Sequence, residues 1–206
     1  MQRAQAIDRK RDIAEAVLRL TARQGLEAAS VRDVAAEAGV SVGLVQHYFR
    51  TKDEMLLFAC QYMIERSGER ARQWIAALPE PHSARTVLRG MLARMLPLDD
   101  ERRIELRIWI AFLARAVVEP ALEVFMRQTH QATHKAIAMQ IRRGQRNGDV
   151  EGSIDPERAT IALFMLVEGL VSHVQVGHYT GDQALQALDD HLATLFRPTA
   201  HTPHEV

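Results

Sequence analysis

The segment from Ser30 to Glu54, "SVRDVAAEAGVSVGLVQHYFRTKDE", constrains the fold most strongly, because three helix starts fall within 25 residues. Ser30, Ser41 and Thr51 are residue types that favour helix N-caps, and Glu54 follows Thr51 at the spacing of a capping box. Gly39 stands between the first two starts, where a sharp turn calls for a residue that tolerates positive φ. The spacing therefore predicts two short helices joined by a glycine-containing turn, followed by a longer helix.

Helical periodicity continues on both sides of this segment. Upstream, apolar residues at helical spacing predict a first helix at about residues 9–24, ended by Gly25. Downstream, the same pattern predicts helices at about residues 52–77, 83–95, 100–117, 119–147, 155–177 and 182–196. No convincing alternation of apolar and polar residues indicates a strand, so the sequence predicts an all-α protein.

Two short helices across a turn, after a first helix, form a three-helix helix-turn-helix arrangement whose last helix fits a DNA major groove. The helix-turn-helix motif itself covers about residues 31–50. The net charge of the chain is zero, but residues 1–52 hold nine basic and six acidic side chains. This distribution suits a small, local phosphate-binding surface and argues against a protein that coats nucleic acid.

The short helix that begins after Ser41 has two faces with different compositions. Val45 and Phe49 share one face, four residues apart, and are expected to enter the core. Gln46 and His47 then face outward, where Gln46 can pair with adenine and His47 can reach a base edge or a phosphate. The predicted DNA-binding residues are Ser30, Arg32, Ser41, Val42, Gly43, Leu44, Gln46, His47, Tyr48, Thr51 and Lys52.

Three of these residues carry specific expectations. Gly43 lacks a side chain and lets the helix backbone approach a duplex closely. Tyr48 is equally suited to a phosphate contact and to a place in the core, and the sequence leaves both open. Lys52 stands in the first turn of the next helix, so its charge and the free amides there are expected to face phosphates.

The run "SVRDVAAEAGVSVGLVQHYFRTKDEML" resembles the DNA-binding signature of the TetR family of bacterial transcriptional regulators. The matching features are the Ala-rich second helix, "AGVS", Gly43, the aromatic pair Tyr48-Phe49, and Lys52 followed by acids and Met55-Leu56. Many members have an aromatic residue where Gln46 stands. The BetI-type repressors resemble this chain in lacking that aromatic residue. The run "ELRIWIAFLARAVVEP" resembles the C-terminal domain of those BetI-type members.

This resemblance implies an N-terminal helix-turn-helix DNA-binding domain at residues 8–68 and a C-terminal helical effector-binding and dimerisation domain at residues 69–197. Residues 198–206 are expected to form a flexible tail. The resemblance further implies a homodimeric repressor that binds a near-palindromic double-stranded DNA operator and is released from it by a small-molecule effector.

Dimerisation in this family usually comes from the last two long helices. The run "ATIALFMLVEGLVSHV" is apolar around most of its circumference, which fits contact with a second copy and also fits a wholly internal helix. The predicted interface residues are Leu163, Leu166, Gly169, Leu170, Val174, Leu188, Leu192 and Leu195.

An effector pocket between the middle helices is a second expectation. Methionine and aromatic side chains suit an adaptable apolar pocket, and an aromatic wall suits a cationic ligand. The predicted pocket residues are Trp109, Phe112, Leu113, Phe125, Met126, Met165 and Glu168. For any single one of them, an ordinary place in the core is the alternative.

Other chemistries lack support in the sequence. There is no Gly-x-Ser-x-Gly elbow, Gly-rich phosphate loop or dinucleotide fingerprint, so no catalytic residue, cofactor or enzyme activity is predicted. His130 and His134 stand four apart without a completing carboxylate, which predicts an exposed pair and no metal site. A single cysteine, the absence of a membrane-length apolar run and a charged N-terminus predict a cytoplasmic protein without membrane contact.

Two alternative functions stay open at this point. The first is an architectural DNA-binding protein of the same fold that responds to no effector. The second is an all-α small-molecule-binding protein or enzyme whose helix-turn-helix no longer binds DNA.

Overall fold

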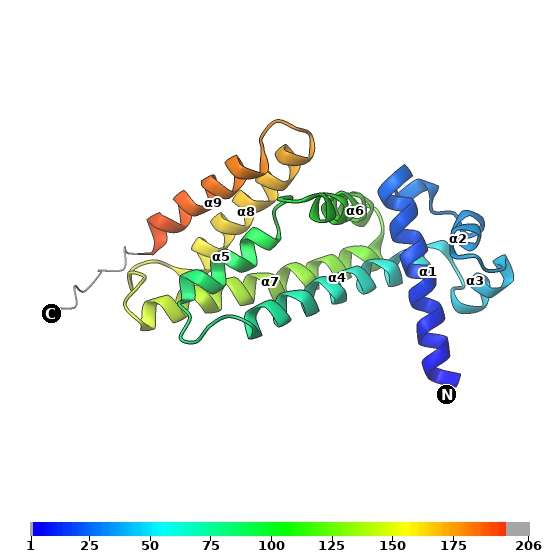
Figure 1. Cartoon of the computed structure of the whole chain (residues 1–206), viewed down its shortest axis with the longest axis horizontal. Helices are drawn as coiled ribbons and strands as arrows, with labels where there is room; N and C mark the ends of the chain where they lie inside the picture. The colour runs from blue at the N-terminus through cyan, green and yellow to red at the C-terminus, as the bar shows by residue number, and fades with distance from the viewer. Residues whose placement is uncertain (1, 197–206) are drawn as a thin grey trace. The chain divides into compact units, whose positions relative to one another are not determined.

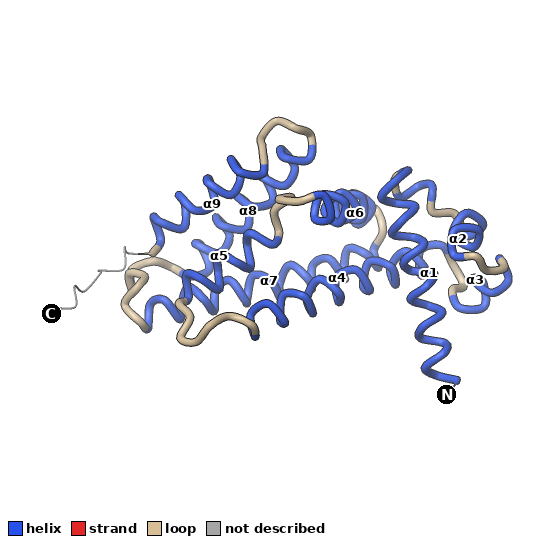
Figure 2. The backbone as a smooth tube through the Cα atoms, viewed as in Figure 1, coloured by secondary structure: helices blue, strands red, loops and turns tan. Residues whose placement is uncertain are grey.

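The structure is a computed structural model, and it describes residues 2–196. Within that range the secondary structure is helical (Figure 2). One isolated β-bridge joins Val150 and Phe196. The helices are α1 (Gln2–Gln24), a 3-10 helix (Leu26–Ala28), α2 (Val31–Ala38), α3 (Val42–Tyr48), α4 (Lys52–Ala76), α5 (Ala84–Arg94), α6 (Asp100–Ala116), α7 (Pro120–Arg146), α8 (Pro156–Gln175) and α9 (Gly181–Leu195). The expectation of an all-α fold is confirmed, and the predicted tail at 198–206 lies outside the described residues.

The observed helix ends lie close to the predicted ones except at the start of α1. This helix begins at Gln2 instead of near residue 9. Its first turns have no apolar stripe, and Ile7 is exposed, so hydrophobic periodicity could not reveal them. Gln, Arg and Ala are good helix formers and extend the helix on propensity alone.

Contacts divide the described chain into two compact units. The N-terminal unit holds residues 2–74 and 104–128, and the C-terminal unit holds residues 75–103 and 129–196. Helices α4, α6 and α7 therefore contribute residues to both units.

In the N-terminal unit, α2 packs against α1 and α3 packs against α2 (Figure 1). Val17 of α1, Val34 of α2 and Val45 of α3 are fully buried in one apolar core. Phe112 of α6 belongs to the same core, so the helix-turn-helix is supported by a helix from the second half of the sequence. Cys60 of α4 is buried there too, and desolvation raises the pKa of its thiol to about 12.

In the C-terminal unit, α9 packs against both α5 and α8. The ion pair between Arg89 of α5 and Asp189 of α9, with Nη2 and Oδ2 2.8 Å apart, joins the first of these pairs. No helix among the described residues is both long enough and apolar enough to cross a membrane.

His130 and His134 lie on the part of α7 that belongs to the C-terminal unit. Both are half-buried, so the prediction of an exposed pair is wrong. Their rings make edge-on contacts with Phe164 of α8, with centroids 5.2 and 4.6 Å from its ring centroid, and packing of this kind accounts for their partial burial. Within the described range, no group of three or more His, Cys, Asp or Glu side chains could hold a metal ion.

Candidate DNA-binding surface

Side-chain caps fix the starts of the two short helices. The Ser30 hydroxyl accepts a hydrogen bond from the Asp33 amide at 3.2 Å and donates one to the Asp33 carboxylate. The Ser41 hydroxyl accepts from the Leu44 amide at 3.2 Å. Each cap satisfies an amide that the first helical turn leaves without a partner, so the sequence defines where α2 and α3 begin.

Gly39 sets the direction in which the chain leaves α2. Its φ of 66° and ψ of 32° lie in the left-handed region, and its amide donates to the Ala36 carbonyl. A side chain would strain this conformation, which explains the glycine. The turn brings α3 back against α2 after only three intervening residues, Gly39, Val40 and Ser41.

The inner face of α3 is anchored as predicted. Val45 and Phe49 are both buried in the core of the N-terminal unit. The ammonium of Lys10 lies 5.2 Å from the Phe49 ring centroid and 5.5 Å from that of Phe58. Sequence reasoning missed this cation–π contact because Lys10 is far upstream, and it ties α1 to the end of α3.

The outer strip of α3, defined here as Val42, Gly43, Gln46 and His47, is exposed. Leu44 and Tyr48 beside it are half-buried. The Tyr48 ring meets the His47 ring edge-on, with centroids 5.1 Å apart. Tyr48 thus occupies a place between core and surface, where its ring can orient His47.

Gly43 is the residue of this strip that the protein's own packing explains least. A Cβ built at this position would meet only the Ser41 hydroxyl oxygen, at 4.0 Å. Glycine inside a helix costs about 1 kcal/mol relative to alanine. Packing within the described residues therefore does not require this position to lack a side chain.

The residues flanking the outer strip have mixed roles. Arg32 is exposed on α2 and Arg50 is exposed directly after α3. The Thr51 hydroxyl accepts from the Glu54 amide at 3.0 Å, and the Glu54 carboxylate accepts from the Arg50 amide at 2.9 Å. These bonds hold the junction from which α4 starts.

Lys52 differs from the expectation of a freely available charge. Its ammonium lies 3.3 Å from the Glu27 carbonyl oxygen and 3.7 Å from a Glu27 carboxylate oxygen. Part of its charge is therefore already used within the chain. Arg50, which the sequence prediction omitted, has an exposed side chain two positions earlier in the chain. The signal that could have indicated it is a basic residue directly after α3.

The predicted effector residues are divided between the two compact units. Five belong to the N-terminal unit, whereas Met165 and Glu168 belong to the C-terminal unit. Phe112 and Met126 are core residues. The half-buried residues of the N-terminal set are Trp109, Leu113 and Phe125. Met165 is 54% exposed, so its assignment to an interior pocket is wrong: the period of α8 turns it away from the buried Leu163.

Glu168 is half-buried, and desolvation raises the pKa of its carboxyl above the usual value. Such a shift is typical of a carboxyl group that burial removes from water.

Most of the predicted dimer-interface residues face the interior of their own chain. Buried within a single copy are Leu163, Leu170, Val174, Leu188 and Leu192. Those five assignments are wrong, because α8 and α9 use these side chains for packing within the C-terminal unit. Leu166 and Leu195 are half-buried and Gly169 is exposed, so these three stay accessible.

The accessible side of α8 is also apolar. Its outer stripe, defined here as Ile161, Met165 and Gly169 together with the C-cap residue Val176, is exposed and recurs at helical spacing. A Cβ added to Gly169 would meet no atom within 4 Å. The helix is therefore apolar on two sides, one of which the chain itself covers.

Family comparisons cover most of the chain. Residues 13–58 match the family described as bacterial regulatory proteins, tetR family, and residues 84–197 match the BetI-type transcriptional repressor C-terminal family. The HTH-type transcriptional regulator PksA of Bacillus subtilis is 30% identical over 168 residues, which cover 82% of this chain and 79% of PksA. The BetI regulator of Yersinia pestis is 31% identical over 114 residues, 55% of this chain and 57% of BetI.

Solved structures agree on the fold. A transcriptional regulator from Rhodococcus sp. Rha1 has a TM-score of 0.79 at 29% identity, covering 90% of this chain and 95% of that one. A regulator from Saccharomonospora viridis in complex with choline has a TM-score of 0.85 at 24% identity, covering 93% and 99%. On these matches and on the geometry of α2 and α3, the chain is a DNA-binding transcriptional regulator that belongs to the TetR family, with a C-terminal region of the BetI type.

Proposed function

We propose that this regulator is a homodimeric repressor that reads a near-palindromic operator with α3 and releases it when a small molecule binds the C-terminal region. The observation that carries the proposal is the exposed outer strip of α3, with its buried anchors behind it and an unexplained glycine in its middle. A rigid strip of this size can enter a major groove. The proposed contacts are Ser30, Arg32, Ser41, Val42, Gly43, Leu44, Gln46, His47, Tyr48, Thr51 and Lys52.

These contacts divide into two kinds. Gln46 and His47 would read base edges, while Val42 would touch a thymine methyl. Arg32, Arg50 and the amides at the start of α4 would bind phosphates and fix the register. Phosphate contacts carry no sequence information, so affinity and specificity are expected to respond to different variants.

The homodimer is supported by the outer stripe of α8. Apolar side chains at helical spacing around an unhindered Gly169 would let the same helix of a second copy approach closely. A twofold arrangement of this kind uses the same patch on both copies. It would present two copies of α3 to half-sites about one helical turn apart, roughly 34 Å.

An organic cation of the choline class is the effector that we propose to test first. The related structure from Saccharomonospora viridis holds choline, and the C-terminal region is of the BetI type. In the C-terminal unit, the half-buried Glu168 carboxylate and the Phe164 ring in contact with two imidazoles have the chemistry that a small cation prefers. A bound cation would also offset the desolvation of the carboxylate.

The test begins with selection of DNA sites from a random library by the purified full-length chain. A near-palindromic sequence should be enriched, and its affinity should fall steeply with salt because phosphate contacts release counterions. Addition of choline should then weaken binding. Many loosely related sites without release by any small molecule would favour the architectural alternative, and the lack of any salt-sensitive DNA affinity would favour an all-α protein that does not bind DNA.

A further inference from the structure

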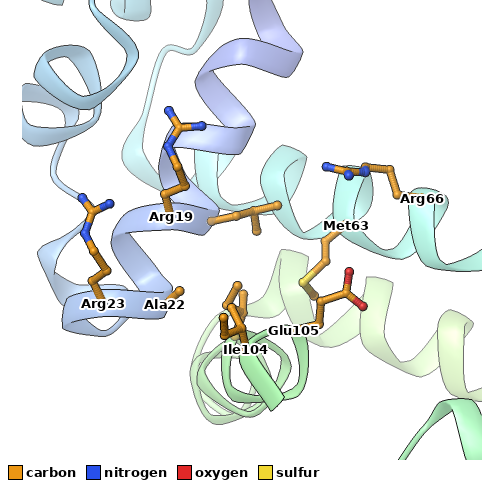
Figure 3. A pocket seen from close by; sticks show the side chains of 9 residues that line it. Arg19, Ala22, Arg23, Met63, Arg66, Ile104 and Glu105 are labelled. Carbon is orange, nitrogen blue, oxygen red and sulfur yellow. The ribbon is translucent and has the colours of Figure 1, made fainter. Parts of the chain in front are cut away.

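A cavity of about 300 Å³ lies within the N-terminal unit, between α1, α4 and α6 (Figure 3). Its volume is at the lower end of the range for small-molecule sites, roughly 300–1,000 Å³. None of its lining residues belongs to the outer strip of α3 or to the predicted effector residues. Its apolar floor consists of Leu18, Ala22, Met63, Ile104 and Ile108.

Charged side chains line the rest of the cavity. The arginine rim, defined here as Arg19, Arg23 and Arg66, extends from α1 and α4, while Ile104 rises from α6 toward α1 (Figure 3). Glu105 is the lining carboxylate, and both its oxygens accept from Arg70, at 2.5 and 2.7 Å. Its charge is therefore already balanced by a neighbour.

Two members of the arginine rim share one partner on the helix-turn-helix. Arg19 Nε lies 2.7 Å from a Glu37 carboxylate oxygen, and Arg23 Nη2 lies 2.5 Å from the other. Glu37 belongs to α2, so these bonds join α2 to α1. The two guanidinium groups also hold the pKa of the Glu37 carboxyl down, to about 2.

Charge around the cavity does not balance. Arg66 pairs with Glu15, with Nη1 and Oε1 3.3 Å apart. Counting the lining groups with their ion-pair partners, four guanidinium groups face three carboxylates: Arg19, Arg23, Arg66 and Arg70 against Glu15, Glu37 and Glu105. An apolar floor under a rim with surplus positive charge is complementary to a molecule with an apolar chain and one anionic head.

We propose that this cavity is a second regulatory site, which binds a small amphipathic monocarboxylate with its chain on the apolar floor and its carboxylate at Arg19 and Arg23. The site goes beyond the effector site proposed for the C-terminal region, because it lies in the unit that contains α3. A bound carboxylate competes with Glu37 for the same guanidinium groups and so loosens α2 from α1. Since α2 leads into α3 through the turn at Gly39, occupancy lowers DNA affinity.

Binding is tested first, without DNA, by calorimetric titration of the full-length protein with octanoate. Octanol and octylammonium, which keep the chain but change the head, serve as comparison ligands. Octanoate should bind saturably, and the other two should bind roughly tenfold more weakly or not at all, because they lack the anionic head. Equal binding of all three ligands, or no saturable binding of octanoate, would overturn the site.

A matched pair of variants locates the binding. Ile104 is 46% exposed, so Ile104→Asp leaves the core intact while placing a carboxylate on the apolar floor of the cavity. Octanoate binding should weaken roughly tenfold or more. Val124→Asp makes the same kind of change at a 41% exposed position of α7 that does not line the cavity, and it should leave binding unaltered. Equal effects of the two variants would contradict the assignment.

Coupling to DNA is tested separately, by fluorescence anisotropy of a selected operator. Saturating octanoate should lower wild-type DNA affinity several-fold and should have no effect on Ile104→Asp. Glu37→Gln removes the competing carboxylate, so this variant should bind octanoate more tightly and its DNA affinity should ignore the ligand. Octanoate binding without any change in wild-type DNA affinity would overturn the coupling. A protein that binds no DNA even without octanoate would instead overturn the proposed function, and calorimetry would still decide the site.

Discussion

At α3, adjacent residues have opposite surroundings: Val45 is fully buried and Gln46 is exposed. The buried member anchors the helix, and Lys10 fixes the end of that anchor through the Phe49 ring. Because the helix backbone is already held in place, binding to a base has to order only the exposed side chain, which lowers the entropic cost of recognition.

Gln46→Ala should reduce operator affinity and relax the preference at one base-pair position. Loss of a bidentate base contact costs about 1–3 kcal/mol, whereas the dependence on salt should stay the same because no charge is removed. Fluorescence anisotropy against the selected operator and its single-base variants measures both effects. Gln61→Ala, the same change at an exposed position of α4, is the control. Identical results for both variants would remove Gln46 from the contacts.

Glu37→Gln should make the protein less stable at neutral pH. The two arginine contacts lower the pKa of the Glu37 carboxyl from 4.5 to about 2 in the folded chain. This carboxylate therefore contributes stability that is complete above about pH 4.5 and is lost as the pH falls toward 2. Urea unfolding between pH 7 and pH 2 should show a shallower acid dependence in the variant. Glu65→Gln, on the exposed face of α4, should behave like the wild type.

Whether a side chain is buried or exposed could be predicted from the sequence where the helical period of one helix alone decided it. Val45 and Gln46 followed from the 3.6-residue repeat of one helix. The contacts of Lys52 with Glu27 and of Lys10 with Phe49 could not be predicted, because each joins residues from different helices. The edge-on contact between the His47 and Tyr48 rings could not be predicted either, because it depends on how the side chains pack.

At the scale of elements, the caps are the part of the fold that the sequence predicts best. Hydroxyl groups at Ser41 and Thr51 accept from the amides that a helix start leaves without partners, and this requirement is local. α8 shows the opposite limit. Its sequence indicated apolar residues on nearly every side, but the choice between Leu163 inward and Met165 outward depends on where α9 lies.

Ser41 offers a way to separate folding from recognition. Ser41→Ala should lower the free energy of unfolding by about 1 kcal/mol through loss of the cap. Ser41→Asp keeps a capping oxygen and should retain stability, yet its charge beside the phosphates should weaken DNA binding. Urea unfolding and anisotropy on the same samples distinguish the two effects. Ser67→Ala at an exposed position of α4 controls for loss of a hydroxyl.

Two helical glycines should respond to alanine with opposite signs. At Gly144 of α7, an added Cβ would lie 2.7 Å from Val150 Cγ2 and 3.0 Å from Phe196 Cε1, so Gly144→Ala should destabilise the protein by about 1–3 kcal/mol. At Gly68 of α4, the nearest atom would be the mobile end of Arg72 at 3.5 Å. Gly68→Ala should therefore stabilise by about 0.5–1 kcal/mol. Thermal or urea unfolding measures both, and equal signs would contradict the packing around Gly144.

At the scale of the whole molecule, the described part of the chain leaves one apolar surface uncovered. The outer stripe of α8 lies in the C-terminal unit, on the side opposite the residues that pack on α9. Sequence predicted a dimer through this helix, but it assigned the interface mainly to the inward face. When both faces of a helix are apolar, the sequence alone does not indicate which face contacts a second copy.

Met165→Asp should weaken the dimer roughly tenfold or more, because a charge in the centre of an apolar contact has to be desolvated. Met165 is 54% exposed, so the change leaves the fold of each copy intact. Sedimentation velocity across a dilution series gives the dimer dissociation constant. Met139→Asp, at a 55% exposed position of α7, is the control, and a dimer that tolerates both changes equally would place the interface elsewhere.

Helix order and helix number followed from sequence because both depend on local periods. The grouping of residues 104–128 with the N-terminal segment did not, since it rests on contacts between distant parts of the chain. The division near residue 68 came from the family pattern and stays a prediction about sequence domains. The cavity beside α1 was likewise invisible, because its lining comes from three separate helices.

Cys60 makes it possible to measure how often the core of the N-terminal unit opens. It is the single cysteine of the chain, fully buried among the side chains that support α3, and its thiol resists ionisation. The thiolate is the form of the side chain that attacks an alkylating reagent, so alkylation proceeds only when that core opens. The rate of alkylation of the unaltered protein, followed by mass spectrometry, therefore reports the rate at which the core behind the helix-turn-helix opens. No label has to be introduced.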